Sequence, residues 1–343
     1  MKNIKDLIEL YDKDDMCDAI MSLPEQIEIS KEIIKKCSFS NNKKYKNIVV
    51  CGMGGSAIGG DFCKLFLKDE LSLSIHVNRG YSIPNWVDND SLVIISSYSG
   101  NTEETISCYN MCIDKKIDPV VISTGGYLLK AAQENNNSYI KVPAGYQPRA
   151  ALGFSLSFIM FTLRELDIIN NNQFIDNTSE LVESLKDFTS SLHSESNNAL
   201  DLAKQIYNKY VIIYTSDKLD SVAYRFRCQL AENSKIISSH FIFPEQNHNE
   251  IEAFENMNID NIAFVWLNHP NDLLQNKKRI NITKNLLSNS GKHYDIKIEN
   301  SLNNYDLVLK MASFVDWVSF YCALLHKTNP SPVNSISKLK SLL

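Results

Sequence analysis

The sequence lacks an excess of positive charge, and it lacks the segments that direct a chain into or across a membrane. Its 343 residues include 35 Lys and Arg against 40 Asp and Glu, for a net charge of −5. This balance argues against general nucleic-acid binding, which usually requires a basic surplus. No run approaches the ~20 apolar residues of a membrane helix, and the N-terminus has no apolar core of a signal peptide. We therefore expect a cytoplasmic protein that binds neither nucleic acid nor membrane.

The cysteine patterns of a disulfide framework or a zinc site are also missing. Eight cysteines are scattered along the chain, and no C-x-x-C pair occurs. Cys108 and Cys112 stand at helical spacing without histidine companions, so free thiols in a reducing cytosol are expected rather than a metal site. The chain does have the length for two ordinary domains, and its apolar content of 44% can supply full cores.

The most informative segment is a glycine-rich turn at residues 51–61, Cys-Gly-Met-Gly-Gly-Ser-Ala-Ile-Gly-Gly-Asp. It follows the apolar run 48–50 and leads into a helical pattern at 61–67. A strand, a glycine turn and a helix in this order build an anion site, because glycine lets the backbone approach a ligand and helix N-termini offer unpaired N–H groups. Gly54 and Gly55 supply the turn and Ser56 adds a hydroxyl, so the segment predicts binding of a phosphorylated ligand.

Neither common nucleotide motif fits this turn. A P-loop needs Gly-Lys-Ser/Thr, which is absent. Gly52, Gly54 and Ala57 satisfy the dinucleotide pattern only loosely, and residues 76–80, His-Val-Asn-Arg-Gly, contain no acid to hold a ribose. A dinucleotide site and a turn selected for packing alone are therefore the weaker alternatives.

A second signal follows the apolar run 92–96, where the sequence continues Ser-Tyr-Ser-Gly-Asn-Thr-Glu-Glu. The hydroxyls of Ser97, Ser99 and Thr102 can point at one spot near a helix N-terminus, which suits a phosphate monoester that is held but not transferred. The alternative is an ordinary N-cap built from Ser99, Thr102 and Glu103. Two such turns at the carboxyl ends of neighbouring strands favour a ligand crevice.

Continuous apolar strands alternate with helical patterns, which predicts an α/β fold with a parallel sheet covered on both faces. The alternation restarts near residue 209, so we expect two similar domains. The expected limits are a helical segment at 1–20, a first domain at 21–168, a helical connector at 169–198 and a second domain at 199–343. Strands are expected at 48–50, 73–77, 92–96, 119–123, 139–142, 209–216 and 262–267, and helices at 61–67, 103–112, 128–135, 151–168 and 305–327, the last packing between the halves or against a partner.

Together the two turns resemble those of a sugar isomerase (SIS) domain. With Pro148-Arg149-Ala150-Ala151-Leu152-Gly153 and Asn247-His248-Asn249-Glu250 they resemble, more narrowly, the bifunctional phosphoglucose/phosphomannose isomerase family, from about residue 20 to the end. The resemblance implies two SIS-type domains with flavodoxin-like, doubly wound sheets. It implies interconversion of glucose 6-phosphate and fructose 6-phosphate, in glycolysis and gluconeogenesis, and also of mannose 6-phosphate, by proton transfer through a cis-enediol without metal or cofactor.

The resemblance also implies the site residues. Glu232, sixteen residues before His248, is the base that moves a proton between carbons 2 and 1. His248 opens the sugar ring and enters from the other subunit of a homodimer, and His240 is the reserve candidate. Arg149 stabilises the enediolate, although by sequence alone it could form a structural salt bridge. The family has a lysine in its last helix that contacts the substrate, and Lys340 matches this lysine better than Lys338 does. Ser331 would influence epimer specificity, because the family tends to carry threonine at this position.

Two rival functions remain. A non-catalytic sugar-phosphate sensor could use the same turns, but no basic segment suits a DNA-binding helix, and a sensor has no need of Glu232 with His248. An amino-sugar phosphate isomerase or deaminase would need groups that handle ammonia, which the sequence does not exclude.

Overall fold

The computed structural model describes residues 3–39, 43–255 and 261–342. It divides into two compact units, each with one parallel sheet. We call residues 22–183 the five-stranded unit, and residues 1–21 with 184–343 the four-stranded unit. Helix α9 (Thr178–Leu192) runs across the division. The first twenty-one residues thus group with the second sheet, whereas the expected connector is shared between the two units.

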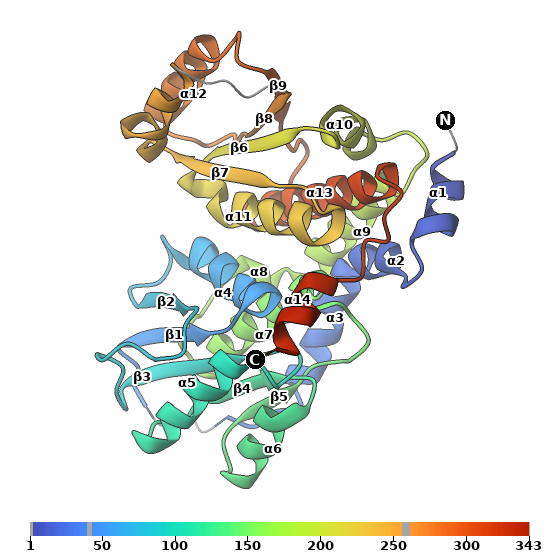
Figure 1. Ribbon diagram of the computed structural model, residues 1–343. Helices are drawn as coiled ribbons and strands as arrows, with labels where there is room; N and C mark the ends of the chain where they lie inside the picture. The colour runs from blue at the N-terminus through green and yellow to red at the C-terminus, as the bar shows by residue number, and fades with distance from the viewer. Residues whose placement is uncertain (1–2, 40–42, 256–260, 343) are drawn as a thin grey trace. The chain divides into compact units, whose positions relative to one another are not determined.

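The five-stranded unit has the strand order β2-β1-β3-β4-β5 (Figure 1). All its strand pairs are parallel. Every residue of β3 and β4 is buried, as in a parallel sheet covered on both faces, whereas β2 at one edge is only half-buried. This order is flavodoxin-like, as expected. Its elements are α3 (Leu23–Ile34), β1 (Asn47–Cys51), α4 (Gly54–Leu67), β2 (Ser74–Asn78), β3 (Ser91–Ser96), α5 (Glu103–Asp114), β4 (Val120–Ser123), α6 (Gly126–Glu134), β5 (Tyr139–Lys141), the short 3-10 turn η1 (Pro148–Ala150), α7 (Leu152–Glu165) and α8 (Gln173–Asp176).

Close backbone contacts join α7 to α4 and to α3. A Cβ on Gly59 would stand 2.6 Å from the carbonyl carbon of Ser155 in α7, and one on Gly153 would stand 2.7 Å from the carbonyl oxygen of Leu23 in α3. Only glycine permits these approaches, because real Cβ atoms do not come so close to backbone. The almost fully buried α7 therefore holds α4, and with it the glycine turn, at the end of β1.

The four-stranded unit has the order β7-β6-β8-β9, which repeats the first four positions of the other sheet. All its strand pairs are also parallel. Its elements are α1 (Ile4–Tyr11), α2 (Met16–Met21), α10 (Asn198–Ile206), β6 (Tyr210–Ser216), η2 (Asp217–Leu219), α11 (Asp220–Gln229), the π-turn η3 (Leu230–Ser234), β7 (Ser238–Phe243), the 3-10 turns η4 (Glu245–His248) and η5 (Glu250–Phe254), β8 (Ile262–Leu267), α12 (Leu274–Leu286), β9 (Lys292–Ile296), α13 (Asn304–Leu325) and α14 (Asn334–Lys340).

Helix α13 is the core helix of this unit and packs on α10 and α11. By length and composition it would be able to cross a membrane, so the expectation that no run approaches that length is wrong. Its most apolar 18-residue window is entirely buried inside the structure, as in the core helix of a globular domain. The expectation that it packs between the halves or on a partner stays a prediction.

Several element predictions need correction. The helix expected at 61–67 begins at Gly54, so the glycine turn is itself the first turn of α4. Glu232 lies on the expected helix, in the π-helical turn that continues α11 to its end. His248 lies in a 3-10 turn, not in an irregular loop. The strands β7 and β9 were not expected, because at the sheet edges they are half-exposed and lack a continuous apolar run.

Candidate functional site

The glycine turn after β1 presents the N-terminus of α4. Its N-cap residue, Met53, is extended, and within the described residues no side chain caps the helix there. Gly54 follows with φ +48°, a left-handed conformation that glycine adopts at no steric cost. The first turn of α4 carries no acid. It therefore offers backbone N–H groups and the positive end of the helix dipole to an anion.

The turn after β3 is held by its own hydroxyls. Ser97 Oγ donates to Thr102 Oγ1 at 3.0 Å and accepts from the backbone N–H of Gly100 at 3.1 Å. Thr102 is the N-cap of α5 but, among the residues described, no side chain caps that helix. The capping alternative is therefore not the arrangement found. Ser99 is exposed, and its Oγ accepts from the N–H of Asn101 at 3.3 Å. The structure brings Ser97 and Thr102 together and leaves Ser99 at the surface.

Tyr98 joins the two turns. Its backbone N–H donates to Ser56 Oγ at 2.9 Å, so the hydroxyl expected from the first turn lies against the second. Its phenol oxygen donates to the carbonyl of Pro143 at 3.0 Å and accepts from the N–H of Tyr146 at 2.9 Å. Sequence reasoning missed this residue, because a tyrosine between two serines carries no signal of its own.

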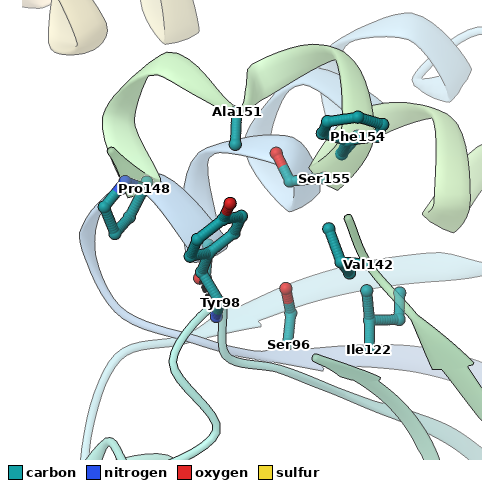
Figure 2. A pocket seen from close by; sticks show the side chains of 10 residues that line it. Ser96, Tyr98, Ile122, Val142, Pro148, Ala151, Phe154 and Ser155 are labelled. Atoms are coloured by element: carbon teal, nitrogen blue, oxygen red, sulfur yellow. Dashed lines mark hydrogen bonds between the residues drawn. The ribbon is translucent and has the colours of Figure 1, made fainter. Parts of the chain in front are cut away.

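Figure 2 shows a small cavity beside Tyr98, with Ser96 and Ile122 on the sheet side and Ala151 and Ser155 on the side of α7. Its volume of about 10 Å³ is close to the least that holds one water molecule. The cavity is therefore part of the packing beneath the turns and is too small for a sugar.

Arg149 lies beside the glycine turn. It belongs to η1 and is 4% exposed. A Cβ on Gly55 would stand 2.4 Å from the carbonyl oxygen of Pro148 and 2.8 Å from the backbone nitrogen of Arg149. The backbone that carries this guanidinium thus packs directly on the first turn of α4.

In the four-stranded unit, a buried polar network holds the π-turn that carries the half-buried Glu232. Asn233 Nδ2 donates to Ser319 Oγ at 2.9 Å, and Ser234 Oγ donates to the carbonyl of Ser319 at 2.7 Å. One turn earlier in α13, Asp316 accepts from the Arg225 guanidinium in a bidentate pair at 2.8 and 2.6 Å. The two residues that follow Glu232, and Arg225 earlier in α11, are therefore anchored to the core helix.

Hydrogen bonds from neighbouring side chains fix the turn that carries His248. Tyr214 donates its hydroxyl to both carboxylate oxygens of Glu250, at 2.9 and 3.0 Å, and Gln246 donates to the same carboxylate at 2.6 Å. Burial raises the pKa of Glu250. Asn247 Nδ2 donates to Thr283 Oγ1 at 2.9 Å, while His248 itself is exposed. The structure thus presents the imidazole on a fixed turn.

The remaining candidates differ in their surroundings. His240 lies on β7, where burial and the charge of Arg227 lower the pKa of its imidazole to about 4, so it is neutral near pH 7. Ser331 is buried, whereas Lys338 and Lys340 are both exposed in α14. Within the described residues no group of three or more His, Cys, Asp or Glu side chains could hold a metal ion.

The sequence of this chain is similar to known proteins over most of its length. Residues 195–343 match the family model described as the bacterial phospho-glucose isomerase C-terminal SIS domain. The bifunctional phosphoglucose/phosphomannose isomerase of Caldicellulosiruptor bescii is 35% identical over 339 residues, which cover 96% of this chain and 98% of that protein. The protein of the same name from Aquifex aeolicus is 34% identical over 302 residues, 87% of this chain and 91% of that protein.

A solved structure agrees on the fold. A hypothetical protein of Thermus thermophilus superposes with a TM-score of 0.75 at 15% identity, covering 98% of this chain and 92% of that one. At this identity the likeness shows the fold alone, two parallel sheets flanked by helices.

Proposed function

The chain belongs to the bifunctional phosphoglucose/phosphomannose isomerase family, and from this premise we propose that it interconverts glucose 6-phosphate and fructose 6-phosphate, and mannose 6-phosphate and fructose 6-phosphate. It does so as a cytoplasmic homodimer of carbohydrate metabolism. The observation that carries the proposal is the hydrogen bond from Tyr98 N–H to Ser56 Oγ. It unites two N-terminal helix turns at the carboxyl ends of β1 and β3, where parallel sheets of this order bind their ligands.

The substrate phosphate is held at these turns and takes no part in the reaction. Backbone N–H groups of the first turn of α4 and the hydroxyls of the second turn donate to its oxygens. The phosphate-binding residues are Gly54, Gly55, Ser56, Ser97, Ser99 and Thr102. Holding the phosphate by many donors orients the sugar chain without any chemistry at phosphorus.

The reaction is a proton transfer between neighbouring carbons. The carboxylate of Glu232 takes the proton from carbon 2 of the open-chain aldose, a cis-enediol forms, and the same proton returns to carbon 1. The guanidinium of Arg149 stabilises the negative charge that develops on the oxygens. His248, donated by the partner subunit, exchanges the protons that open the ring. Lys340 contacts the substrate, and Ser331 influences which epimer is accepted.

The experiment that tests the proposal is a coupled assay of the wild-type chain with the three hexose 6-phosphates, followed by the Glu232→Gln variant. We expect turnover of all three substrates by the wild type and a loss of roughly 10³-fold or more in kcat in the variant, because the amide cannot accept the proton. Inhibition by inorganic phosphate should persist in any residual activity. Glu299→Gln, an exposed acid of the same unit, is the matched control and should keep full activity.

Other outcomes identify the rivals. Binding of hexose phosphates without turnover by the wild type would indicate a sugar-phosphate sensor. Ammonia release from an amino-sugar phosphate would indicate a deaminase. Turnover that survives Glu232→Gln would leave the isomerase but defeat the assigned base.

A further inference from the structure

The lysine that follows the Glu232 turn caps that turn with its side chain. Lys235 has a left-handed backbone, φ +59° and ψ 32°, and its N–H donates to the carbonyl of Leu230. Its Nζ donates to the carbonyl oxygen of Glu232 at 2.5 Å and to that of Asn233 at 3.4 Å. Because the last carbonyls of a helix have no intrahelical donor, the ammonium satisfies the end of this turn.

The same ammonium reaches a second segment. Nζ of Lys235 donates to the carbonyl oxygen of Pro332 at 2.8 Å. Pro332 directly follows Ser331, which is 2% exposed. The backbone N–H of Ser331 donates to Asn329 Oδ1 at 3.0 Å, and Asn329 Nδ2 donates to Asp14 Oδ2 at 2.8 Å. The segment 329–332 is thus held by a bond within it and by a bond to Asp14, and Lys235 connects it to the turn of Glu232.

We propose that Lys235 is a positioning residue that fixes the position of the Glu232 carboxylate relative to Ser331. It thereby determines the ratio of the isomerisation rates of glucose 6-phosphate and mannose 6-phosphate. The inference rests on the function proposed above. The two epimers differ only in configuration at carbon 2, the atom from which Glu232 takes the proton. A shift of the base relative to the segment 329–332 therefore changes the two rates by different factors.

The test is the Lys235→Met variant, with kcat/KM measured for glucose 6-phosphate and mannose 6-phosphate on one preparation. We expect the ratio of the two values to change by about threefold or more, because the variant loses charge-assisted hydrogen bonds on both segments. The inhibition constant of inorganic phosphate should stay unchanged, because the phosphate turns belong to the five-stranded unit. Lys235→Arg keeps a cationic donor and should return the ratio toward the wild-type value.

Two further variants separate positioning from stability. Lys235→Gly keeps the left-handed backbone without the side chain and should shift the ratio as Lys235→Met does. Lys116→Met is the matched control, since Lys116 is also exposed and left-handed, with φ +60°, at the end of α5. It should leave the ratio unchanged.

The contrary results are equally clear. A merely structural lysine would lower the Tm and both rates by one common factor, so an unchanged ratio in Lys235→Met overturns the inference while the proposed function stands. The wild type could act on only one of the two epimers. In that case, activity of Lys235→Met on the second epimer supports the inference, and lack of such activity contradicts it. A wild type inactive on both epimers overturns the proposed function and this inference together.

Discussion

At the residue scale, the hydroxyl of Ser56 shows why single positions matter in the five-stranded unit. It is 8% exposed and accepts from the backbone of Tyr98, so it joins the two turns. A hydroxyl that satisfies a buried backbone donor cannot be removed without leaving that donor unpaired. The same residue therefore serves the fold and, in the proposed function, the phosphate.

A second residue-scale consequence concerns pH. The folded-state pKa of His240 is lowered to about 4 by burial, below the ordinary value of 6.5. Its stabilising contribution is therefore fully present above pH 6.5, and it is lost as the pH falls from 6.5 toward 4, because the unfolded chain takes up the proton first.

We expect the unfolding free energy of His240→Gln to depend less on pH in this acidic range than that of the wild type. Between pH 7 and pH 5 the wild type should lose roughly 1–2 kcal/mol more unfolding free energy than the variant, after a discount for partial exposure of the imidazole. Urea unfolding at the two pH values measures the difference. Equal losses in both proteins would show that His240 titrates normally in the folded state.

At the element scale, the start of α4 depends on contact with η1. The backbone of Pro148 and Arg149 occupies the space where a side chain at residue 55 would begin. The N-terminus of α4 and the backbone of η1 therefore pack directly against each other, so neither can shift alone. The π-turn η3 is fixed in a similar way in the other unit, because Asn233 and Ser234 are hydrogen-bonded to Ser319 of α13.

We expect Gly55→Ala to separate α4 from η1. The added methyl would stand 2.4 Å from the Pro148 carbonyl oxygen, so the backbone must move, at a cost of about 1–3 kcal/mol in unfolding free energy. The affinity for inorganic phosphate should fall with it, as measured by isothermal titration. Gly80→Ala is the control, since a Cβ there meets nothing within 4 Å. Unaltered phosphate affinity in Gly55→Ala would mean that phosphate binds elsewhere.

At the scale of the whole molecule, the two units repeat one topology but not one chemistry. The four shared strand positions have the same order, yet β6 leads into η2 with Asp217 in its first turn, where β1 leads into glycines. An acid at a helix start disfavours an anion. This agrees with the proposal that only the five-stranded unit holds phosphate.

The proposed homodimer can be tested by mixing inactive variants. If His248 acts on the partner's substrate, a heterodimer of Glu232→Gln and His248→Asn has one site with both defects and one intact site. Unfolding and refolding an equal mixture should then restore about a quarter of wild-type activity, since half of the dimers are mixed and each has one working site. Each variant refolded alone should stay inactive. No recovery in the mixture would place Glu232 and His248 on the same chain.

The sequence alone determined the architecture of the five-stranded unit, because its buried strands are continuous apolar runs and its turns carry glycine and serine. It also indicated the family through three short motifs, which the comparisons confirm. It did not reveal β7, β9 or α12, since half-exposed edge strands and a helix with weak segregation of apolar residues carry little periodic signal. The assigned site roles stay predictions.

Only the tertiary structure decided which groups meet. The bond from Tyr98 to Ser56, the packing of Arg149's backbone on Gly55 and the bridge made by Lys235 join residues 42, 94 and 97 positions apart. Local patterns record whether a residue is buried or capped, because those properties depend on its neighbours along the chain. Contacts between distant segments depend on how helices and strands pack, and no local pattern contains that information.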